Sequence, residues 1–291
     1  MVEIDRYTGR ASARYRVWHV DTRKSDSGIE AGEIEIAIEE PLSLMVNGAQ
    51  LAVLMRLPGM EKELAAGYLV SEGLVGRFDD ILTIHHCGQG LPGPGEYASE
   101  DGAEWRNRVE VRVRDGGLRP DARMDTVRLI RAGCGAVEVA HIGVELPILP
   151  KDVWVPARTL LKAGTALRRA KGLRENVGGI HTVGIYGLNG SALVNAEDVG
   201  RHNAVDKAAG HCLLRGVPLD ESIMVCSGRL SYEMASKAVR LGIRVVASFS
   251  GPTALAMDLA DRCGLTLVGY LRAHRMIVYT HPERVTPDKS R

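Results

Sequence analysis

The sequence predicts an α/β protein, α+β overall, with a β-rich α+β domain at residues 33–150 and an α/β domain at residues 151–291. Three observations support this fold class. Strands and helices alternate regularly between Ile223 and Leu271, which favours parallel strands joined by helical crossovers. Asn47-Gly48 separates two runs of alternating apolar residues, a strong β-hairpin signal. At 291 residues the chain is long enough to bury two hydrophobic cores.

The composition is that of a globular protein without a strong overall charge. Hydrophobic residues make up 45% of the chain, charged residues make up 25%, and the net charge is +1. No general field therefore attracts nucleic acid or a membrane surface, and no apolar run is long enough to span a bilayer. The N-terminus lacks the apolar segment of a signal peptide. Five cysteines without paired spacing indicate reduced thiols and a cytoplasmic protein: Cys87, Cys134, Cys212, Cys226 and Cys263.

The chain begins with polar residues 1–32, which show no sustained periodicity and predict a loosely attached arm. Ile34, Ile36 and Ile38 then alternate with glutamates, which predicts a half-buried strand. The rest of the N-terminal domain follows from similar patterns. We expect a hairpin at 42–55, a helix that closes at Gly73, strands at 81–85 and 109–113, and a domain boundary near Lys151 before a helix at about 156–172.

Residues 85–104 contain two patterns that look like ligand motifs. The segment from Gly88 to Gly93 has the glycine spacing of a dinucleotide fingerprint, but that motif has to open a helix, and the prolines at 92 and 94 prevent one. His85-His86-Cys87 are metal-ligating residue types, but no second ligand pair follows at zinc-like spacing. We therefore expect a strand end and a loop here, with no metal.

The stretch from Gly178 to Gly210 is dense in polar groups. Its first part predicts a hairpin with strands at 181–186 and 192–194, and a helix follows from about Ala204. Two interpretations of the junction stay open, a polar loop that caps the helix through Asn203 or the wall of a binding pocket. The other polar residues of this junction are His181, Glu197, Asp198, Arg201 and His202.

Three turns follow the strands predicted at 223–226, 243–249 and 265–271. In such a sheet, ligands bind beyond the carboxyl ends of the strands. The first two turns also open helices, whose free N–H groups suit an anion, and arginine side chains match phosphate oxygens. The sequence therefore predicts a phosphate or pyrophosphate ligand, rather than ordinary surface turns, at Ser227-Gly228-Arg229, Ser250 to Thr253 and Arg272-Ala273-His274-Arg275.

Cys134 is the candidate reactive thiol. It lies between two glycines, so a bulky partner can approach its backbone closely. Arg128 and Arg131 lie just upstream and favour the thiolate, which is the nucleophilic form. An ordinary loop cysteine is the alternative. The cysteines expected in the core, from their apolar helix or strand positions, are Cys212, Cys226 and Cys263.

The chain resembles the FdhD family, the sulfurtransferase accessory proteins of formate dehydrogenase. GGIHT at 178–182 and EDVGRHNAVDK at 197–207 carry the resemblance. Further matches, in the family's order, are MRLPGMEKELAAGYLVSEGL at 55–74, SGRLSYEMASKA at 227–238 and LVGYLRAHRMIVYTHP at 267–282. They cover roughly residues 33–285. The resemblance implies a C-terminal three-layer αβα domain that is similar to the cytidine deaminase fold.

The resemblance also implies that Cys134 receives sulfur from a cysteine desulfurase and carries it as a persulfide. Family members commonly have C-x-x-C here, but the second position of this chain is Val137, so a two-cysteine relay within the loop is impossible. The sulfur goes to molybdenum bis(molybdopterin guanine dinucleotide), the cofactor of the formate dehydrogenase catalytic subunit, and the family is homodimeric. The cofactor, with its GDP- or GMP-like moiety, is expected at Tyr270, Leu271, Arg272, Ala273, His274 and Arg275, and at Ser227, Gly228 and Arg229.

Other functions remain as alternatives. A non-enzymatic chaperone would hold the cofactor and dock it into formate dehydrogenase, and the missing second cysteine favours this alternative. A zinc deaminase needs H-x-E and P-C-x-x-C, but the only H-x-E is His281-Pro282-Glu283, and no C-x-x-C occurs. A Ser-His-Asp hydrolase lacks its G-x-S-x-G elbow.

Overall fold

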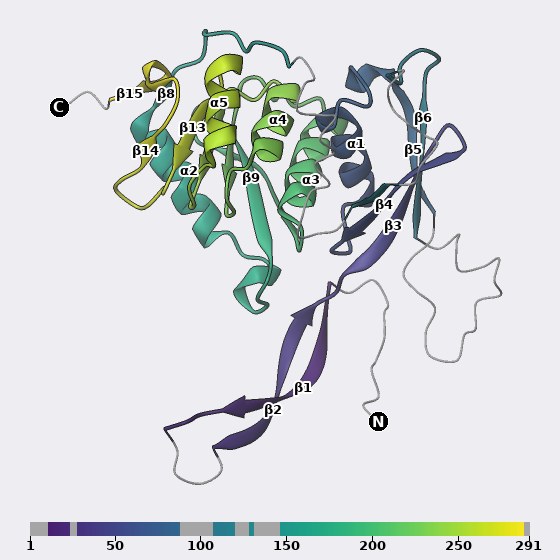
Figure 1. Cartoon of the computed structure of the whole chain (residues 1–291), viewed down its shortest axis with the longest axis vertical. Helices are drawn as coiled ribbons and strands as arrows, with labels where there is room; N and C mark the ends of the chain where they lie inside the picture. The colour runs from purple at the N-terminus through teal and green to yellow at the C-terminus, as the bar shows by residue number, and fades with distance from the viewer. Residues whose placement is uncertain (1–10, 24–27, 88–106, 120–127, 131–145, 288–291) are drawn as a thin grey trace.

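The computed structural model describes residues 11–23, 28–87, 107–119, 128–130 and 146–287. Two larger β-sheets lie on either side of a helical layer, as Figure 1 shows. The N-terminal sheet has the strand order β5-β6-β3-β4-β7, and the C-terminal sheet has the order β10-β9-β11-β12-β13-β14. Helices α1 and α3 pack against each other between the sheets. The chain is thus a mixed α and β protein, as the sequence predicts.

The N-terminal sheet is built around a hairpin. Its strands are β3 (Glu40–Val46), β4 (Ala49–Arg56), β5 (Ile81–Cys87), β6 (Arg108–Val113) and β7 (Arg128–Ile130). Strands β3 and β4 turn through Asn47 and Gly48, both with positive φ, which confirms the Asn-Gly signal. Apolar side chains that alternate along β3, β4 and β6 pack against helix α1 (Glu61–Ser71) and form the core of this half.

The C-terminal sheet contains the predicted hairpin and the predicted parallel strands. Its strands are β9 (His181–Gly187), β10 (Ala192–Asp198), β11 (Ser222–Cys226), β12 (Val245–Ser248), β13 (Thr266–Gly269) and β14 (Ile277–Val278). Strands β9 and β10 are antiparallel, and β11, β12 and β13 are parallel. The third parallel strand ends before its predicted limit of Leu271, because Tyr270 turns the chain with a φ of 48°. The antiparallel strand β14 was not predicted.

Helices cover both faces of the C-terminal sheet. They are α2 (Ala157–Arg169) on one face, and α3 (Arg201–Leu214), α4 (Tyr232–Arg240) and α5 (Ala254–Cys263) on the other. Along β11, Ile223 and Val225 pack on the α2 side, whereas Met224 and Cys226 pack on the opposite side. This half is therefore a three-layer αβα arrangement. No helix in the described ranges has the length and apolarity needed to cross a membrane.

Smaller elements complete the described chain. Strands β8 (Val155–Pro156) and β15 (Val285–Thr286) pair in parallel and join the start and the end of the C-terminal half. Three short 3-10 helices lie at Phe78–Asp80, Leu173–Glu175 and Pro282–Arg284.

Two glycines let helices α1 and α3 touch backbone to backbone. A methyl group at Gly67 of α1 would lie 1.9 Å from the carbonyl oxygen of Asp206 in α3. A methyl group at Gly210 of α3 would lie 1.8 Å from the carbonyl oxygen of Glu63 in α1. Neither position has room for any side chain, so the reciprocal glycines set the distance between the two halves.

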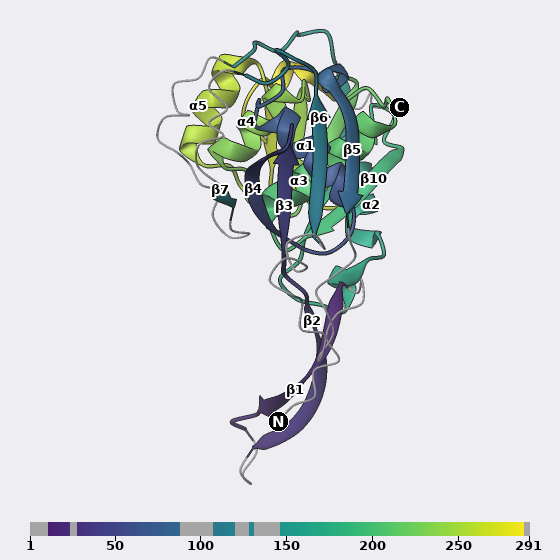
Figure 2. The ribbon, with the colours of Figure 1, turned by 90° about the vertical axis from the view of Figure 1, so that its right-hand side faces the viewer.

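The N-terminal arm is a two-stranded ribbon. Strands β1 (Ser12–Val20) and β2 (Ile29–Ala37) pair antiparallel and project from the rest of the molecule, as Figures 1 and 2 show. The arm therefore continues past residue 32. The predicted half-buried strand is confirmed as a strand, and Ile38 just after it is buried at 5% exposure, but Ile34 and Ile36 were wrongly expected to be covered, since they are 42% and 40% exposed. The alternation of apolar residues correctly indicated a strand, but no helix in the described part of the chain packs on this strand.

Candidate functional site

The three predicted turns meet at one edge of the C-terminal sheet, because β11, β12 and β13 end side by side there. The turn after β11 is fixed to β9 by a reciprocal pair of hydrogen bonds. The Ser227 N–H donates to the Thr182 carbonyl at 2.9 Å, and the Thr182 N–H donates to Ser227 Oγ at 2.9 Å. Ser248, at the end of β12, donates its hydroxyl to the Gly228 carbonyl at 2.5 Å.

The third turn is held directly against the second. The Tyr270 N–H donates to the Ser250 carbonyl at 3.1 Å. Nη1 of Arg272 donates to the Phe249 carbonyl at 2.8 Å. Arg168 of α2 stacks over the Phe249 ring at 4.4 Å, so the end of α2 also adjoins this edge. Arg272 was predicted to bind a ligand. In the structure its guanidinium instead connects the second turn to the third through a hydrogen bond.

The remaining predicted residues differ in what they offer a ligand. Leu271 is fully buried among the side chains that face α2. Ala273 is exposed but has no polar side chain. Arg229, His274 and Arg275 are also exposed, and within the described ranges their side chains make no hydrogen bond or ion pair. Among the predicted residues that the structure describes, these three side chains are the ones most free to contact an anion at this edge.

Tyr270 presents its ring to solvent from a strained backbone. Its φ of 48° lies in the left-handed region, which is uncommon for a non-glycine residue, and the residue is 48% exposed. A methyl group at Gly251 would lie 3.0 Å from the Tyr270 hydroxyl oxygen, so the ring lies over that glycine. The turns thus combine an exposed aromatic face with nearby cations, a combination that suits a nucleotide.

His181 adjoins the first turn. A methyl group at Gly228 would lie 3.2 Å from Nδ1 of His181, so a larger residue in the turn would press on that ring. Burial, together with the nearby Arg201 charge, lowers the pKa of His181 below its ordinary value. His181 is therefore a neutral imidazole at pH 7, able to donate or accept a proton in a hydrogen bond.

His202, at the start of α3, is paired with Glu233 in the first turn of α4. Nε2 of His202 lies 2.9 Å from Oε2 of Glu233. This contact holds the pKa of Glu233 below its ordinary value, against the opposing effect of burial. The hydroxyl of Ser231 donates to the same carboxylate oxygen at 3.3 Å. Glu233 was not predicted, although it lies two residues after Ser231 in the SGRLSYEMASKA segment.

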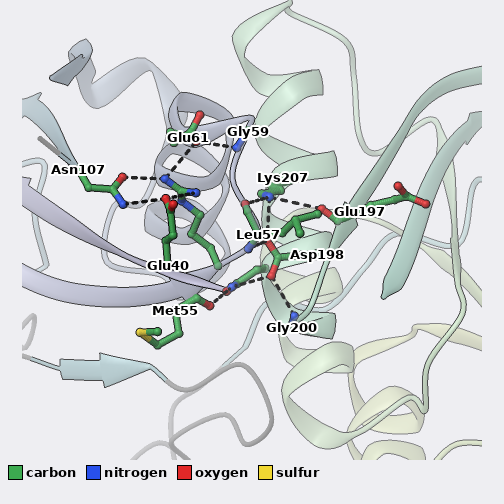
Figure 3. A network of polar contacts seen from close by, with 12 residues as sticks. Glu40, Met55, Leu57, Gly59, Glu61, Asn107, Glu197, Asp198, Gly200 and Lys207 are labelled. Atoms are coloured by element: carbon green, nitrogen blue, oxygen red, sulfur yellow. Dashed lines mark hydrogen bonds and ion pairs between the residues drawn. The ribbon is translucent and has the colours of Figure 1, made fainter. Parts of the chain in front are cut away.

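Asp198 lies in a different environment, where all its neighbours are donors. Its carboxylate accepts from the Leu57 N–H at 3.1 Å, the Gly200 N–H at 2.9 Å and Asn203 Nδ2 at 3.1 Å, and it pairs with Lys207 Nζ at 2.7 Å (Figure 3). Asp198 is fully buried. With its acceptor positions occupied, Asp198 joins the end of strand β4 to the start of α3 and leaves no acceptor for a ligand.

Asn203 does not cap helix α3. The helix begins at Arg201, before the predicted start at Ala204, and its N-cap position is Gly200. Asn203 therefore lies inside the helix, where Nδ2 donates to the Met55 carbonyl at 2.7 Å as well as to Asp198. The capping interpretation was wrong because Asn203 bonds to the distant β4 strand instead of to its own helix.

A second buried cluster, centred on Arg56, lies beside the first in Figure 3. Its guanidinium lies 3.3 Å from Glu40 and 3.3 Å from Glu61, and Nη2 donates to Asn107 Oδ1 at 2.7 Å. The side chain of Arg56 is only 2% exposed. No local pattern in the sequence indicates this cluster, because its members are separated by as many as 67 residues.

A small cavity of about 270 Å³ lies between the segment that follows β4, strands β9 and β10, and helix α3. It is lined in part by Leu57, Met60, Thr182, Glu197 and Lys207. Thr182 is 1% exposed, and its Oγ1 has no hydrogen-bond partner in the described part of the chain. Since the Thr182 backbone also bonds to Ser227, the cavity adjoins the edge that carries the three turns.

Comparison with known proteins identifies the group to which this sequence belongs. The model of the FdhD/NarQ family matches residues 37–286. The chain belongs to the FdhD/NarQ family. A protein named sulfur carrier protein FdhD from Mycobacterium bovis is 37% identical over 284 residues, which are 96% of this chain and 100% of the relative. One of the same name from Anaeromyxobacter dehalogenans is 35% identical over 257 residues, which are 86% of this chain and 88% of the relative.

A solved structure has the same fold. A putative formate dehydrogenase accessory protein from Desulfotalea psychrophila matches with a TM-score of 0.71 and 26% identity, covering 95% of this chain and 100% of the other. The FdhD fold is therefore shared along almost the whole length. The likeness to the cytidine deaminase fold is not confirmed by these comparisons and stays a prediction.

Most of the described cysteines of this FdhD family member are buried. Cys212, Cys226 and Cys263 are buried, as predicted. Burial raises the pKa of Cys212 to about 11 and that of Cys226 to about 12, so both remain thiols at neutral pH. Cys134 and Val137 lie outside the described residues. Across the described ranges, no three His, Cys, Asp or Glu side chains gather as a metal site, and His281 contacts Glu283 at 3.2 Å.

Proposed function

We propose that this chain is a sulfur carrier that serves formate dehydrogenase. It accepts sulfur from a cysteine desulfurase as a persulfide on Cys134 and delivers it to molybdenum bis(molybdopterin guanine dinucleotide), the cofactor of the formate dehydrogenase catalytic subunit. The names of its relatives and of the similar solved structure support a sulfur-carrying accessory role. Its working location is the cytoplasm, and the functional unit is a homodimer.

The meeting of the three turns is the observation that carries the cofactor part of the proposal. Arg229, His274 and Arg275 are exposed and unpaired within the described ranges, and the adjacent Tyr270 ring is open to solvent. Guanidinium groups pair with phosphate oxygens, and an aromatic face stacks with a guanine ring. A GDP- or GMP-like part of the cofactor therefore fits here, where it would also contact the backbone of Ser227 and Gly228 in the first turn.

The sulfur step follows from thiol chemistry. The Cys134 thiolate attacks the outer sulfur of the desulfurase persulfide, forms a new sulfur–sulfur bond and releases the desulfurase cysteine as a thiolate. No net oxidant is consumed, because the sulfur arrives already at the persulfide level. Val137 cannot capture this sulfur as a neighbouring cysteine would, so the persulfide persists until the cofactor or a reductant reaches it.

The missing second cysteine also supports a second candidate, a chaperone that holds the cofactor without transferring sulfur. One experiment separates the two. The protein is incubated with a cysteine desulfurase and cysteine, and intact mass is measured for the unmodified protein and for Cys134→Ala. A sulfur carrier gains one sulfur atom that maps to Cys134 and is absent from the variant.

Cys87→Ala provides the matched control, because Cys87 is the one cysteine of the described ranges that is not buried. It should gain sulfur like the unmodified protein. Equal labelling of Cys134→Ala would assign the chemistry to another cysteine. Absence of sulfur from every protein, with several desulfurases, would favour the chaperone.

A further inference from the structure

The cavity beside Thr182 contains a buried hydroxyl group without a hydrogen-bond partner. Thr182 is 1% exposed, and its Oγ1 makes no hydrogen bond in the described part of the chain, although its backbone N–H donates to Ser227 Oγ at 2.9 Å. The cavity measures about 270 Å³, and Thr182, Asn195 and Glu197 form part of its wall. A buried polar atom without a partner is rare in native proteins and indicates that another molecule occupies the space beside it.

The polar side chains of the cavity share one face of the β9–β10 hairpin. Glu197 lies directly opposite Thr182 in the strand pair, and Asn195 lies two residues before Glu197, so all three point to the same side of the sheet. Oδ1 of Asn195 accepts from the Tyr186 hydroxyl at 3.0 Å, whereas Nδ2 donates to no group in the described ranges. The wall therefore offers an amide donor, a carboxylate and a hydroxyl group next to one another.

The Glu197 carboxylate is held in one orientation but has no counter-ion in the described part of the chain. Oε2 accepts from the Leu173 N–H at 2.7 Å, and Oε1 accepts from the Arg174 N–H at 3.4 Å. Figure 3 shows the carboxylate extending away from the pair formed by Lys207 and Asp198. A carboxylate has about four acceptor positions, so two remain. Glu197 can therefore accept from a ligand that presents two adjacent N–H groups.

Charge and size restrict the class of ligand. Lys171 also lines the cavity, and its ammonium has no partner in the described ranges, so it would repel a cationic group such as a guanidinium. Leu57, Met60 and Leu173 supply apolar wall. A volume of about 270 Å³ is below the roughly 300–1,000 Å³ of pockets that hold drug-sized ligands. These conditions favour one neutral, flat ring system over a whole nucleotide.

We propose that this cavity binds the pterin ring of the cofactor. Glu197 accepts from the ring N–H and the adjacent amino group, Asn195 donates to the neighbouring carbonyl oxygen, and the Thr182 hydroxyl donates to a ring nitrogen. This aminopyrimidinone edge also occurs in guanine, but the proposed function, on which the inference rests, assigns the guanine to Tyr270. Strands β9 and β13 are three strand spacings apart, about 14 Å, a distance that an extended pterin–guanine dinucleotide spans.

Titration of the protein with hydroxymethylpterin, followed by pterin fluorescence, tests the site without the assembled cofactor. Binding to the unmodified protein should saturate. Lumazine, which has a carbonyl group in place of the amino group, should bind tenfold or more weakly, because its carbonyl oxygen would face the Glu197 carboxylate. Guanosine carries the same edge as the pterin together with a ribose, and it should not displace the pterin from this cavity.

Two variants test the residues that contact the ring. Glu197→Gln should weaken pterin binding tenfold or more, because an amide N–H₂ replaces one acceptor. Thr182→Val removes a hydroxyl that has no partner in the described part of the chain, so it should weaken binding about three- to tenfold while the melting temperature stays the same or rises. Glu221→Gln, at an exposed position before the opposite end of β11, is the matched control and should bind pterin like the unmodified protein.

The outcomes separate this site from the proposed function. Absence of saturable pterin binding, equal affinity for lumazine, or unchanged affinity in both Glu197→Gln and Thr182→Val would overturn the pterin site. Guanosine that displaces the pterin and loses affinity in Glu197→Gln would assign the cavity to guanine instead. GDP binding that depends on Arg275, and sulfur uptake by Cys134, are measured on the same protein, and their success or failure reports on the proposed function alone.

Discussion

The ammonium of Lys207 lies 2.7 Å from the carboxylate of Asp198, and both side chains are almost completely excluded from solvent, at 1% and 0% exposure. The same ammonium donates to the Leu57 carbonyl at 2.7 Å and to the Glu197 carbonyl at 3.3 Å. The three N–H groups of the ammonium therefore meet three acceptors, one just after β4 and two at the end of β10. The pair lies in the EDVGRHNAVDK segment and joins the two halves of the chain rather than serving chemistry at the turns.

Replacing Asp198 with asparagine should destabilise the protein severely. The change leaves a buried lysine without its counter-ion, which typically costs about 3–5 kcal/mol in the free energy of unfolding. Urea unfolding followed by circular dichroism measures the effect. The double variant Asp198→Asn/Lys207→Met should lose less than the single variant, because it removes the unpaired charge as well. A single variant as stable as the unmodified protein would refute this account of the pair.

Gly67→Ala should force helices α1 and α3 apart. The added methyl group would meet the Asp206 carbonyl oxygen at 1.9 Å, and neither helix backbone can move without disturbing a core. We expect a loss of about 3 kcal/mol or more, beyond ordinary overpacking. Gly76→Ala is the matched control, because a methyl group there has no atom within 4 Å. Thermal unfolding of both variants tests the prediction, which fails if they melt alike.

Arg275→Ala should weaken GDP binding without changing stability. The loss of one charge-assisted contact is worth about 1.5–3 kcal/mol, which is roughly tenfold or more in affinity. Arg272→Ala should also weaken binding, but with lower stability, since Arg272 holds the second and third turns together. Titration calorimetry and thermal unfolding separate the two cases. Arg77→Ala, on the other half of the chain, is the control, and unchanged affinity in Arg272→Ala/Arg275→Ala would remove both residues from the site.

The Glu233 carboxylate should make stability depend on pH in the acidic range. Its pKa in the folded protein is below the ordinary value of 4.5, chiefly because of the His202 contact. The folded state therefore holds fewer protons than the unfolded chain near that pH, so the contribution is present above about 4.5 and is lost as pH falls through the lower folded pKa. The stability difference between the unmodified protein and Glu233→Gln should shrink between pH 6 and pH 3.5 in urea unfolding. A constant difference would contradict the assignment.

The buried thiols should resist alkylation in the native state. With pKa values raised to about 11 and about 12, Cys212 and Cys226 have almost no thiolate at pH 7.5. Iodoacetamide followed by peptide mass analysis should leave both unmodified until the protein is denatured, whereas Cys134 should react first. Rapid modification of Cys226 in the folded protein would show that β11 opens readily.

Local patterns in the sequence predicted most of the elements. The hairpin at Asn47-Gly48 and the parallel strands after Ser222 depend on alternation and on short turns, which act over a few residues. Because parallel strands end at one edge, the meeting of the three turns was also predictable from order alone. The antiparallel β14 was missed because two residues are too short a run to show a period.

Hydrogen bonds between residues far apart in the chain could not be predicted from local sequence patterns. The Leu57 N–H bond to Asp198 spans 141 positions, and nothing near Asp198 indicates that partner. Asn203 looked like a cap for the same reason, since its actual acceptor, the Met55 carbonyl, is 148 positions away. The exposure of Ile34 was likewise unpredictable, because alternation shows that a strand has an apolar face without showing what covers it.

The reciprocal contact at Gly67 and Gly210 has a mechanical consequence. Helices that meet through side chains can slide by exchanging rotamers, but helices in backbone contact have no such freedom, and neither hinge nor shear motion is open to them without separation. The N-terminal sheet and the edge that carries Arg275 therefore behave as one rigid frame. A ligand that binds at that edge would therefore keep a fixed distance from the N-terminal sheet for as long as α1 and α3 stay in contact.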